Sequence, residues 1–146
     1  MDYAQKKSHM QKGFTLIEIL IAAALVMILG GIATASYRGI VESNSKSSTQ
    51  ASLKSIKFAI ETYHDEIGEY PQSLQDLVRR PSDEKAAANW RPFIESKNNQ
   101  APRDAWKNAY VYNVTEGAEN PFELYSYGSK KGKSTPKTGW LDAWNL

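Results

Sequence analysis

An uninterrupted apolar stretch near the N-terminus, residues 14–35, constrains the fold of this chain more than any other feature. Its 22 residues include one charged side chain, Glu18. A helix rises about 1.5 Å per residue, so a helix of this length spans roughly 33 Å. The hydrocarbon core of a bilayer is about 30 Å thick. The sequence therefore predicts a membrane-spanning helix in this region.

Positive charge precedes the apolar stretch, at Lys6, Lys7 and Lys12. Basic residues next to a membrane helix mark its cytoplasmic side, which predicts a single pass with a cytoplasmic N-terminus. With Asp2, residues 1–13 carry a net charge of 3 − 1 = +2, which equals the net charge of the whole chain. The excess of positive charge therefore indicates which end of the chain stays in the cytoplasm, and we expect no nucleic-acid partner.

Glu18 needs an explanation, because a carboxylate at the bilayer centre costs about 2.5–3.5 kcal/mol and less near the interface. No Lys or Arg occurs between Gly13 and Arg38. Two explanations remain open. Either the helix dipole helps the interface to tolerate the charge, or a cation comes from another chain or from a new N-terminus.

The segment KGFTLIE, residues 12–18, resembles the processing site of the type IV pilin and pseudopilin family. The resemblance implies that a membrane-embedded prepilin peptidase cleaves between Gly13 and Phe14, and that the new N-terminal Phe14 is N-methylated. It also implies that Glu18 pairs with the N-terminal amine of a neighbouring subunit during filament assembly.

The same resemblance divides the chain into three parts. Residues 1–13 form a cleaved leader, residues 14–35 a transmembrane and assembly helix, and residues 36–146 a periplasmic globular domain. The implied location is the inner membrane. Gly30 and Gly31 lie inside the membrane helix, where small residues permit close helix packing. If the helix unwinds on assembly, these two glycines are the expected place.

Helical periodicity continues beyond the membrane segment. Apolar residues spaced 3, 4, 3 and 4 apart form one stripe, which indicates an amphipathic helix; they are Leu53, Ile56, Ile60, Tyr63 and Ile67. No Pro or Gly interrupts residues 40–67, and Gly68 suits the position after a helix end. We therefore predict one helix from Phe14 to about Ile67.

For the chain after Gly68, the sequence predicts short helices and strands that cover this apolar stripe. Ser73 suits the N-cap of a short helix through Val78, and residues 82–89 read as a loop or a frayed turn. Residues 109–114, 122–127 and 140–144 are rich in β-branched and aromatic side chains, which favour strands. The predicted fold class is α+β, with a long N-terminal helix packed against a small antiparallel sheet, as in the pilin fold.

No arrangement of residues suggests an enzyme. The chain has no cysteine, and we find no phosphate-binding glycine loop, no Ser/His/Asp arrangement and no metal-binding cluster. His64 stands alone on the predicted helix and is expected to be a partly exposed structural residue. We therefore predict no catalytic residue.

The C-terminal half narrows the resemblance to the major pseudopilins of type II secretion systems. The features that carry it are, in order, YP at 70–71, DAWKN at 104–108, YVY at 110–112 and LYSYG at 124–128. The resemblance implies a structural subunit that polymerises with itself and with minor pseudopilins on an inner-membrane secretion platform, and drives export of folded proteins. The alternative is a type IV pilin for motility, adhesion or DNA uptake.

The loop after Gly128 departs from that family, whose members usually carry calcium-binding acids there. This chain has four lysines, and Asp142 is the one acid after Glu123; the lysines are Lys130, Lys131, Lys133 and Lys137. Calcium takes six to eight oxygen ligands, several of them carboxylates. We therefore expect no metal or other cofactor, with the lysines reaching carbonyl groups or acids such as Asp104, Glu123 or Asp142.

The same lysines, with the nearby Tyr125 and Tyr127, suggest a second reading as a DNA receptor. Basic and aromatic side chains together can bind single strands. A solvated lysine loop is the commoner explanation of such a pattern, and we favour it.

Overall fold

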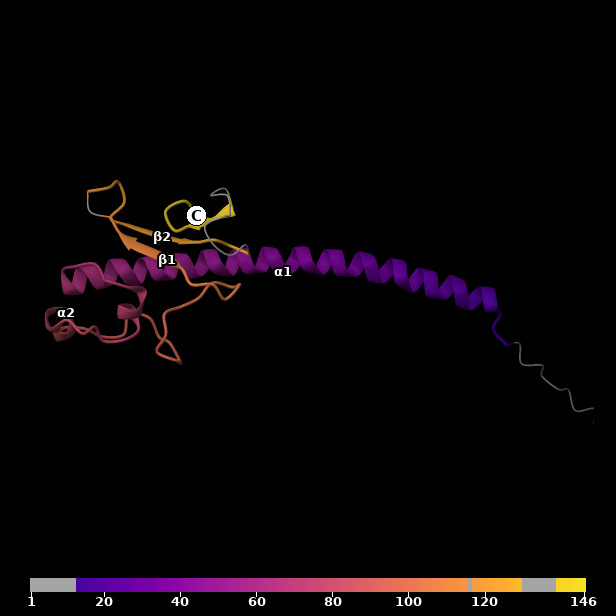
Figure 1. Ribbon diagram of the computed structural model, residues 1–146, viewed down its shortest axis with the longest axis horizontal. Helices are drawn as coiled ribbons and strands as arrows, with labels where there is room; N and C mark the ends of the chain where they lie inside the picture. The colour runs from indigo at the N-terminus through magenta and orange to yellow at the C-terminus, as the bar shows by residue number, and fades with distance from the viewer. Residues whose placement is uncertain (1–12, 116, 130–138) are drawn as a thin grey trace, which may run out of the picture. The chain divides into compact units, whose positions relative to one another are not determined.

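The computed structural model describes residues 13–115, 117–129 and 139–146. Its elements in chain order are the helix α1 (Leu16–Ile67), the 3-10 helix η1 (Leu74–Leu77), the helix α2 (Glu84–Ala88) and the strands β1 (Val111–Val114), β2 (Phe122–Ser126) and β3 (Leu141–Asp142) (Figure 1). Contacts divide the chain into two units, Met1–Gly39 and Ile40–Leu146. The predicted α+β class, one long helix with a small antiparallel sheet, is confirmed.

The first unit presents α1 without a covering layer. Every large aliphatic side chain from Leu16 to Ile32 is at least 53% exposed. The helix is long and apolar enough to cross a membrane. A helix that is hydrophobic on all sides needs an apolar environment, so this part of α1 suits lipid or the interior of a helical assembly.

The second unit has its own core, formed between α1 and the sheet. The strands are antiparallel in the order β1-β2-β3, with Tyr112 opposite Leu124 and Ser126 opposite Leu141. Along β2, Phe122 and Leu124 are buried and Glu123 between them is exposed, as expected when one face of a sheet meets a core.

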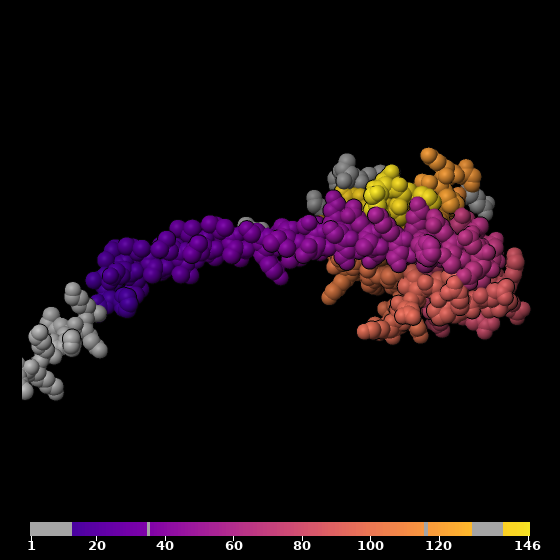
Figure 2. Space-filling view, turned by 180° about the vertical axis from the view of Figure 1, so that it is seen from behind, coloured from indigo at the N-terminus to yellow at the C-terminus, as the bar shows by residue number. Residues whose placement is uncertain are grey.

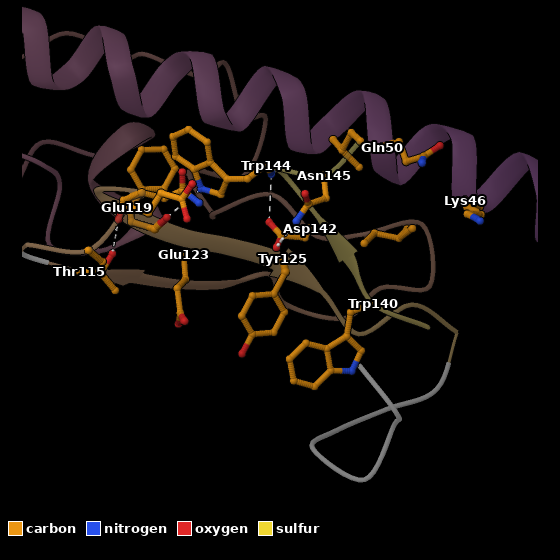
Figure 3. Close-up of a pocket in the computed structure, with 15 residues that line it drawn as sticks. Lys46, Gln50, Thr115, Glu119, Glu123, Tyr125, Trp140, Asp142, Trp144 and Asn145 are labelled. Atoms are coloured by element: carbon orange, nitrogen blue, oxygen red, sulfur yellow. Dashed lines mark hydrogen bonds between the residues drawn. The ribbon is translucent and has the colours of Figure 1, made fainter. Parts of the chain in front are cut away.

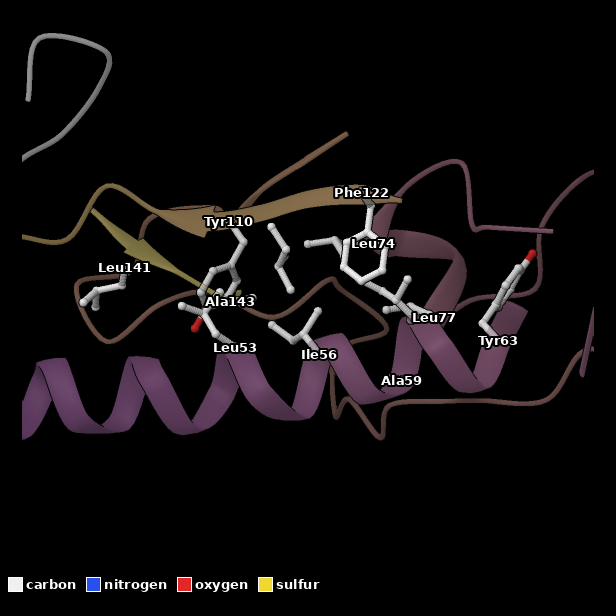
Figure 4. Close-up of a cluster of buried hydrophobic side chains, with 12 residues drawn as sticks. Leu53, Ile56, Ala59, Tyr63, Leu74, Leu77, Tyr110, Phe122, Leu141 and Ala143 are labelled. Carbon is white, nitrogen blue, oxygen red and sulfur yellow. The ribbon is translucent and has the colours of Figure 1, made fainter. Parts of the chain in front are cut away.

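The predicted apolar stripe of α1 forms the other wall of this core. Leu53, Ile56, Ile60 and Tyr63 are at most 2% exposed, and Ile67 packs against them at the edge. Figure 4 shows side chains of α1 and of the sheet meeting in this cluster.

The end of α1 also agrees with the sequence. Gly68 has a φ of +88°, a left-handed conformation that glycine adopts without a steric penalty, and its N–H donates to the carbonyl of His64 at 2.8 Å. The N–H of Ser73 then donates to the carboxylate of Asp76 at 2.8 Å at the start of η1. The helix predicted there is present, but its turn is 3-10 rather than α.

The prediction of a loop or frayed turn over residues 82–89 is wrong, because this segment includes the helix α2. The carboxylate of Asp83 accepts a hydrogen bond from the N–H of Lys85 at 3.2 Å and caps the helix. Ala86 is buried on its inner side. Alanine has the highest intrinsic helix propensity, so the three alanines of this segment favour a short helix once Asp83 caps it.

The strands are shorter than predicted. β1 begins at Val111 rather than Ala109, because Ala109 pairs with Arg103 in an isolated bridge. β3 has two residues, because the carboxylate of Asp142 accepts a hydrogen bond from the N–H of Trp144 at 3.0 Å and turns the chain.

Trp144 fixes the last segment of the chain to both walls of the core. Its indole N–H donates to the carbonyl of Phe122 at 2.8 Å, and its ring lies 5.1 Å from the ring of Phe122. The ammonium of Lys57, on α1, lies 3.4 Å from the centre of the Trp144 ring. Such a cation–π contact is worth about 0.5–1 kcal/mol at exposed sites.

Candidate processing and assembly site

Gly13 and Phe14 precede the first turn of α1 and are accessible. Phe14 is 87% exposed, and no atom of the described chain lies within 4 Å of the position that a β-carbon on Gly13 would occupy. The peptide bond between the two residues is therefore open to a protease. The lysines at positions 6, 7 and 12 lie outside the described residues.

Glu18 has a partner within its own chain that we did not predict. Its carboxylate accepts hydrogen bonds from the N–H and from the hydroxyl group of Thr15, each at 2.8 Å. The N–H of Glu18 in turn donates to the Thr15 hydroxyl oxygen at 3.3 Å. This reciprocal arrangement is a capping box, with Thr15 as the N-cap and Glu18 as the third residue of α1.

The capping box satisfies the hydrogen bonds of Glu18 but not its charge. Both donors on Thr15 are neutral, so a cation is still absent beside the carboxylate in the described chain. Pairing of Glu18 with the N-terminal amine of a neighbour stays a prediction. The geometry adds that Thr15 holds the carboxylate at the start of the helix, next to the residue that becomes the N-terminus if Gly13 is removed.

The two glycines in the apolar stretch are helical in this structure. The hydroxyl group of Thr34 donates to the carbonyls of Gly30 and Gly31, at 3.2 and 2.9 Å. No side chain lies within 4 Å of a β-carbon placed on either glycine. Another helix can therefore approach the backbone closely here, as small residues permit in membranes. Unwinding on assembly stays a prediction.

The DAWKN segment forms a turn around the buried carboxylate of Asp104. One carboxylate oxygen accepts hydrogen bonds from the N–H groups of Trp106 and Asn108, at 3.0 and 2.7 Å. The other accepts one from the hydroxyl group of Ser126 at 2.7 Å. Asp104 is 4% exposed, and buried charges are stable only with such full hydrogen bonding. This segment is therefore structural.

An open cavity of about 580 Å³ lies beside β3 (Figure 3). Lys46 and Gln50 of α1 line one side, and Tyr125 and Trp140, whose rings stack 4.7 Å apart, line another. Burial, together with the neighbouring Tyr127, raises the pKa of Tyr125 to about 12, so its hydroxyl group is neutral at physiological pH.

Two of the acids around this cavity, Asp142 and Glu123, are bound to neutral donors. Asp142 accepts hydrogen bonds from the N–H of Trp144 and from the side-chain amide of Asn145, at 3.0 and 3.4 Å. Glu123 accepts one from the side-chain amide of Asn113 at 3.3 Å. Within the described ranges, no three His, Asp or Glu side chains gather where they could hold a metal ion. The absence of a calcium site stays a prediction, because most of the loop concerned lies outside the described residues.

The lysine loop itself falls outside the described residues, at positions 130–138, so the contacts predicted for its four lysines stay predictions. The described residues at its two ends lie close together. A β-carbon on Gly128, whose φ is +75°, would lie 3.1 Å from the carbonyl oxygen of Gly139. Glycine is required at position 128 by both the close approach and the conformation.

Two family models cover most of the chain. The model described as "Prokaryotic N-terminal methylation motif" matches residues 8–34, which include Gly13, Phe14 and Glu18. The model described as "Type II secretion system (T2SS), protein G" matches residues 37–139.

Curated relatives agree with these models. The chain is 31% identical to the type II secretion system core protein G of Pseudomonas aeruginosa, over 85% of this chain and 89% of that protein. It is 28% identical to the protein of the same name from Escherichia coli K12, over 89% and 91% of the two chains, and 25% identical to that of Vibrio cholerae, over 97% of each. No solved structure matches the chain. This chain belongs to the protein G family of type II secretion systems.

Proposed function

We propose that the mature chain is a structural subunit that polymerises into the periplasmic pseudopilus of a type II secretion system and so drives export of folded proteins. The observation that carries the proposal is the match to protein G over residues 37–139, directly after an N-terminal methylation motif. The uncovered apolar half of α1 supports it, because such a helix needs lipid or other helices around it.

Genetic complementation in the native host tests this function. Deletion of the gene should abolish secretion of the exported proteins, and the wild-type gene should restore it. Overproduction of the wild-type chain with the secretion machinery should yield filaments in electron micrographs. Unchanged secretion in the deletion strain, together with no filaments on overproduction, would overturn the proposal.

Processing by a prepilin peptidase is the first step of the proposal. Removal of residues 1–13 leaves 146 − 13 = 133 residues that begin with methylated Phe14. Intact-mass analysis of the membrane fraction should find this species. A Gly13→Val variant, which places a branched side chain at the open peptide bond, should keep its full length. A wild-type chain that stays full length beside an active peptidase would contradict this step.

The proposed topology places the N-terminus in the cytoplasm and the unit Ile40–Leu146 in the periplasm, with one pass through the inner membrane. The three lysines before the apolar stretch support this orientation. Because the chain has no cysteine, a Ser129→Cys variant can be labelled at one site. A membrane-impermeant maleimide should label this cysteine in intact spheroplasts, in which the periplasmic side of the inner membrane faces the medium. Labelling only after lysis would indicate the opposite topology.

The proposed partners are further copies of this chain, minor pseudopilins, the prepilin peptidase and the inner-membrane platform. A nucleic acid is not among them. The protein G match favours the pseudopilin function over the type IV pilin alternative.

The proposal includes no catalytic step and no cofactor. Asp104, Glu123 and Asp142 are each bound to neutral donors of this chain, which supports a fold that is stable without calcium. In this proposal, hydrogen bonds rather than a metal ion stabilise these carboxylates.

A further inference from the structure

The turn at residues 103–108 carries two exposed cations at one end of the second unit. Arg103 and Lys107 are exposed, and Trp106 between them is half-buried. The guanidinium of Arg103 donates a hydrogen bond to the carbonyl of Lys107 at 3.1 Å, which keeps the two cationic residues side by side. Within the described ranges, neither cation forms an ion pair. We call Arg103, Trp106 and Lys107 the basal rim.

The basal rim lies at the end of the unit where α1 enters it. The indole N–H of Trp106 donates to the carboxylate of Glu42 at 3.2 Å, two residues after the unit begins at Ile40. The N–H of Ala105 donates to the hydroxyl oxygen of Thr49, also at 3.2 Å. Figure 2 shows the orange segment around residue 105 against α1 at this end. Trp106 therefore fixes the position of the rim along α1.

This position is close to the end of the apolar stretch. Glu42 follows Ala35 by seven residues, which is about 10.5 Å of helix. The headgroup layer takes up about 5–7.5 Å on each side of the hydrocarbon core. A helix whose apolar stretch lies in that core therefore holds Glu42 about 3–6 Å beyond the headgroups. This separation is shorter than the Debye length of about 8 Å at physiological ionic strength, so the charges of the rim act on the lipid surface.

The charge of α1 is polarised in the same direction. From residue 40 to residue 57 the helix carries three lysines and one acid, a net charge of 3 − 1 = +2. From residue 58 to residue 67 it carries three acids and no Lys or Arg, a net charge of −3 with His64 neutral. Arg91 offsets one of these acids, Glu66, from outside the helix. An anionic surface therefore attracts the end of the helix that carries the basal rim.

Two carboxylates near the rim are occupied by hydrogen bonds. Asp104 is 4% exposed and accepts from two backbone N–H groups and from Ser126. Glu42 accepts the indole N–H of Trp106. These acids lower the net charge of the region, but neither pairs with Arg103 or Lys107. The two cations therefore keep donors for an external anion.

We infer that the basal rim binds the phosphate groups of anionic phospholipids on the periplasmic face of the inner membrane before the subunit enters a filament. This inference rests on the proposed function, which anchors α1 in that membrane. The planar guanidinium of Arg103 suits two phosphate oxygens at once, and the ammonium of Lys107 supplies a point charge. The contact holds the second unit of an unassembled subunit against the bilayer and breaks when the subunit leaves the membrane.

Energy transfer between the second unit and the lipid surface tests this contact. The full-length chain has no cysteine, so Ser129→Cys carries a donor dye at one position. Ser129 follows Gly128, whose carbonyl accepts from the side chain of Asn108 in the 103–108 turn. A second variant, Ala118→Cys, carries the dye near Gly68 at the far end of α1. Each is reconstituted in nanodiscs with an acceptor-labelled lipid, in phosphatidylcholine alone or mixed with phosphatidylglycerol.

We expect phosphatidylglycerol to raise the transfer from position 129 and not from position 118. High salt should remove the rise, because it screens exposed charges. The substitutions Arg103→Gln and Lys107→Gln should each lower the ratio of bound to free rim by about fivefold, as for one cation near an anionic surface.

The matched control is Arg79→Gln/Arg80→Gln, which removes the same charge from two exposed positions outside the rim. It should keep the wild-type response. The four lysines at positions 130–137 stay unchanged in every variant, and equal melting temperatures show that the fold is kept. The salt dependence of the unsubstituted rim tests the inference even where a variant does not fold.

The inference is overturned if phosphatidylglycerol leaves the transfer from position 129 unchanged. It is also overturned if the double variant Arg103→Gln/Lys107→Gln responds as wild type does, because other cations then bind the lipid. Either result leaves the proposed function standing, since that function is decided by the secretion and filament assays. If those assays fail and the rim still responds to anionic lipid, the proposed function is wrong and the lipid contact is confirmed.

Discussion

The carboxylate of Asp104 accepts a hydrogen bond from the hydroxyl group of Ser126 at 2.7 Å, across 22 residues of chain. The same hydroxyl oxygen accepts a hydrogen bond from the N–H of Gly128 at 3.0 Å, and the side-chain amide of Asn108 donates to the carbonyl of Gly128 at 3.2 Å. The DAWKN turn is thereby tied to the end of β2 through buried polar groups.

Loss of this carboxylate should destabilise the second unit strongly. Asp104→Ala leaves two N–H groups and the Ser126 hydroxyl without their acceptor, and each buried unsatisfied group costs about 1–3 kcal/mol. We expect a decrease of about 3 kcal/mol or more in the free energy of unfolding, measured by urea denaturation of Ile40–Leu146. The control Glu119→Gln, at an exposed position, should change it by less than about 0.5 kcal/mol. Equal stability of the two variants would contradict the structural role of Asp104.

Lys107→Gly should stabilise the same unit. Lys107 has a φ of +68°, a left-handed conformation that costs a residue with a β-carbon about 1 kcal/mol relative to glycine. We expect the free energy of unfolding to rise by about 0.5–1 kcal/mol. Lys97→Gly, at an exposed position outside the left-handed region, should instead lower it through unfolded-state entropy. A loss of stability in Lys107→Gly would count against the conformation described.

Glu18 can be tested for charge and for capping separately. Glu18→Gln keeps a side chain that can accept the Thr15 hydrogen bonds of the capping box but removes the charge, whereas Glu18→Ala removes both. If charge pairing with a neighbouring N-terminus drives assembly, both variants should be processed normally and both should lose filament incorporation, measured by crosslinking. Normal assembly of Glu18→Gln with failure of Glu18→Ala would assign the role to the cap instead.

Acid should weaken the link between α1 and the segment after α2. The Arg91 guanidinium donates to both carboxylate oxygens of Glu66, with the Nε–Oε2 distance at 3.0 Å, and these hydrogen bonds hold the pKa of Glu66 below its usual range. A depressed pKa contributes stability above the unfolded value of about 4.3 and loses it as pH falls through the folded value.

Arg91→Met removes this pH-dependent contribution. Its melting temperature should lie below that of wild type at pH 7, and the difference should shrink as pH falls below about 4.3. Lys85→Met, which breaks the looser exposed contact with Glu69 at 3.9 Å, is the control and should show a smaller difference. A pH-independent difference for Arg91→Met would contradict the ion pair.

Calcium should not change the stability of the second unit. The acids near the lysine loop are bound to neutral donors, so no free carboxylate cluster is available within the described residues. Melting of Ile40–Leu146 should be the same with chelator and with millimolar Ca²⁺. Calcium at 100 times its dissociation constant would add about 2.7 kcal/mol, so a rise of several degrees would show a site that these contacts do not reveal.

The helical part of the fold was predictable because its signals are local and repeated. The stripe from Leu53 to Ile67 and the glycine after it follow from the 3.6-residue period and from backbone sterics. The helix α2 was missed because it has five residues and depends on the burial of one alanine, Ala86. The strand ends were predicted too long because the Asp142 turn interrupts a pattern that propensity alone would extend.

The site was predictable as a motif but not as a geometry. Gly13, Phe14 and Glu18 come from the resemblance of residues 12–18 to a family processing site, and their roles stay predictions. The pattern Thr-x-x-Glu at 15–18 was itself a capping-box signal that we did not use. The Asp104 network was not predictable, because it joins residues 22 apart whose contact depends on how the sheet packs.

The contact of Trp144 with Lys57 and Phe122 sets the order of events during biogenesis. The core needs α1 on one wall and Leu141, Ala143 and Trp144 on the other, so it cannot close before residue 144 has been synthesised. If the second unit is exported as proposed, the polypeptide therefore crosses the membrane before this core forms. A product that stops short of these residues lacks part of one wall of the core and is left open to proteolysis.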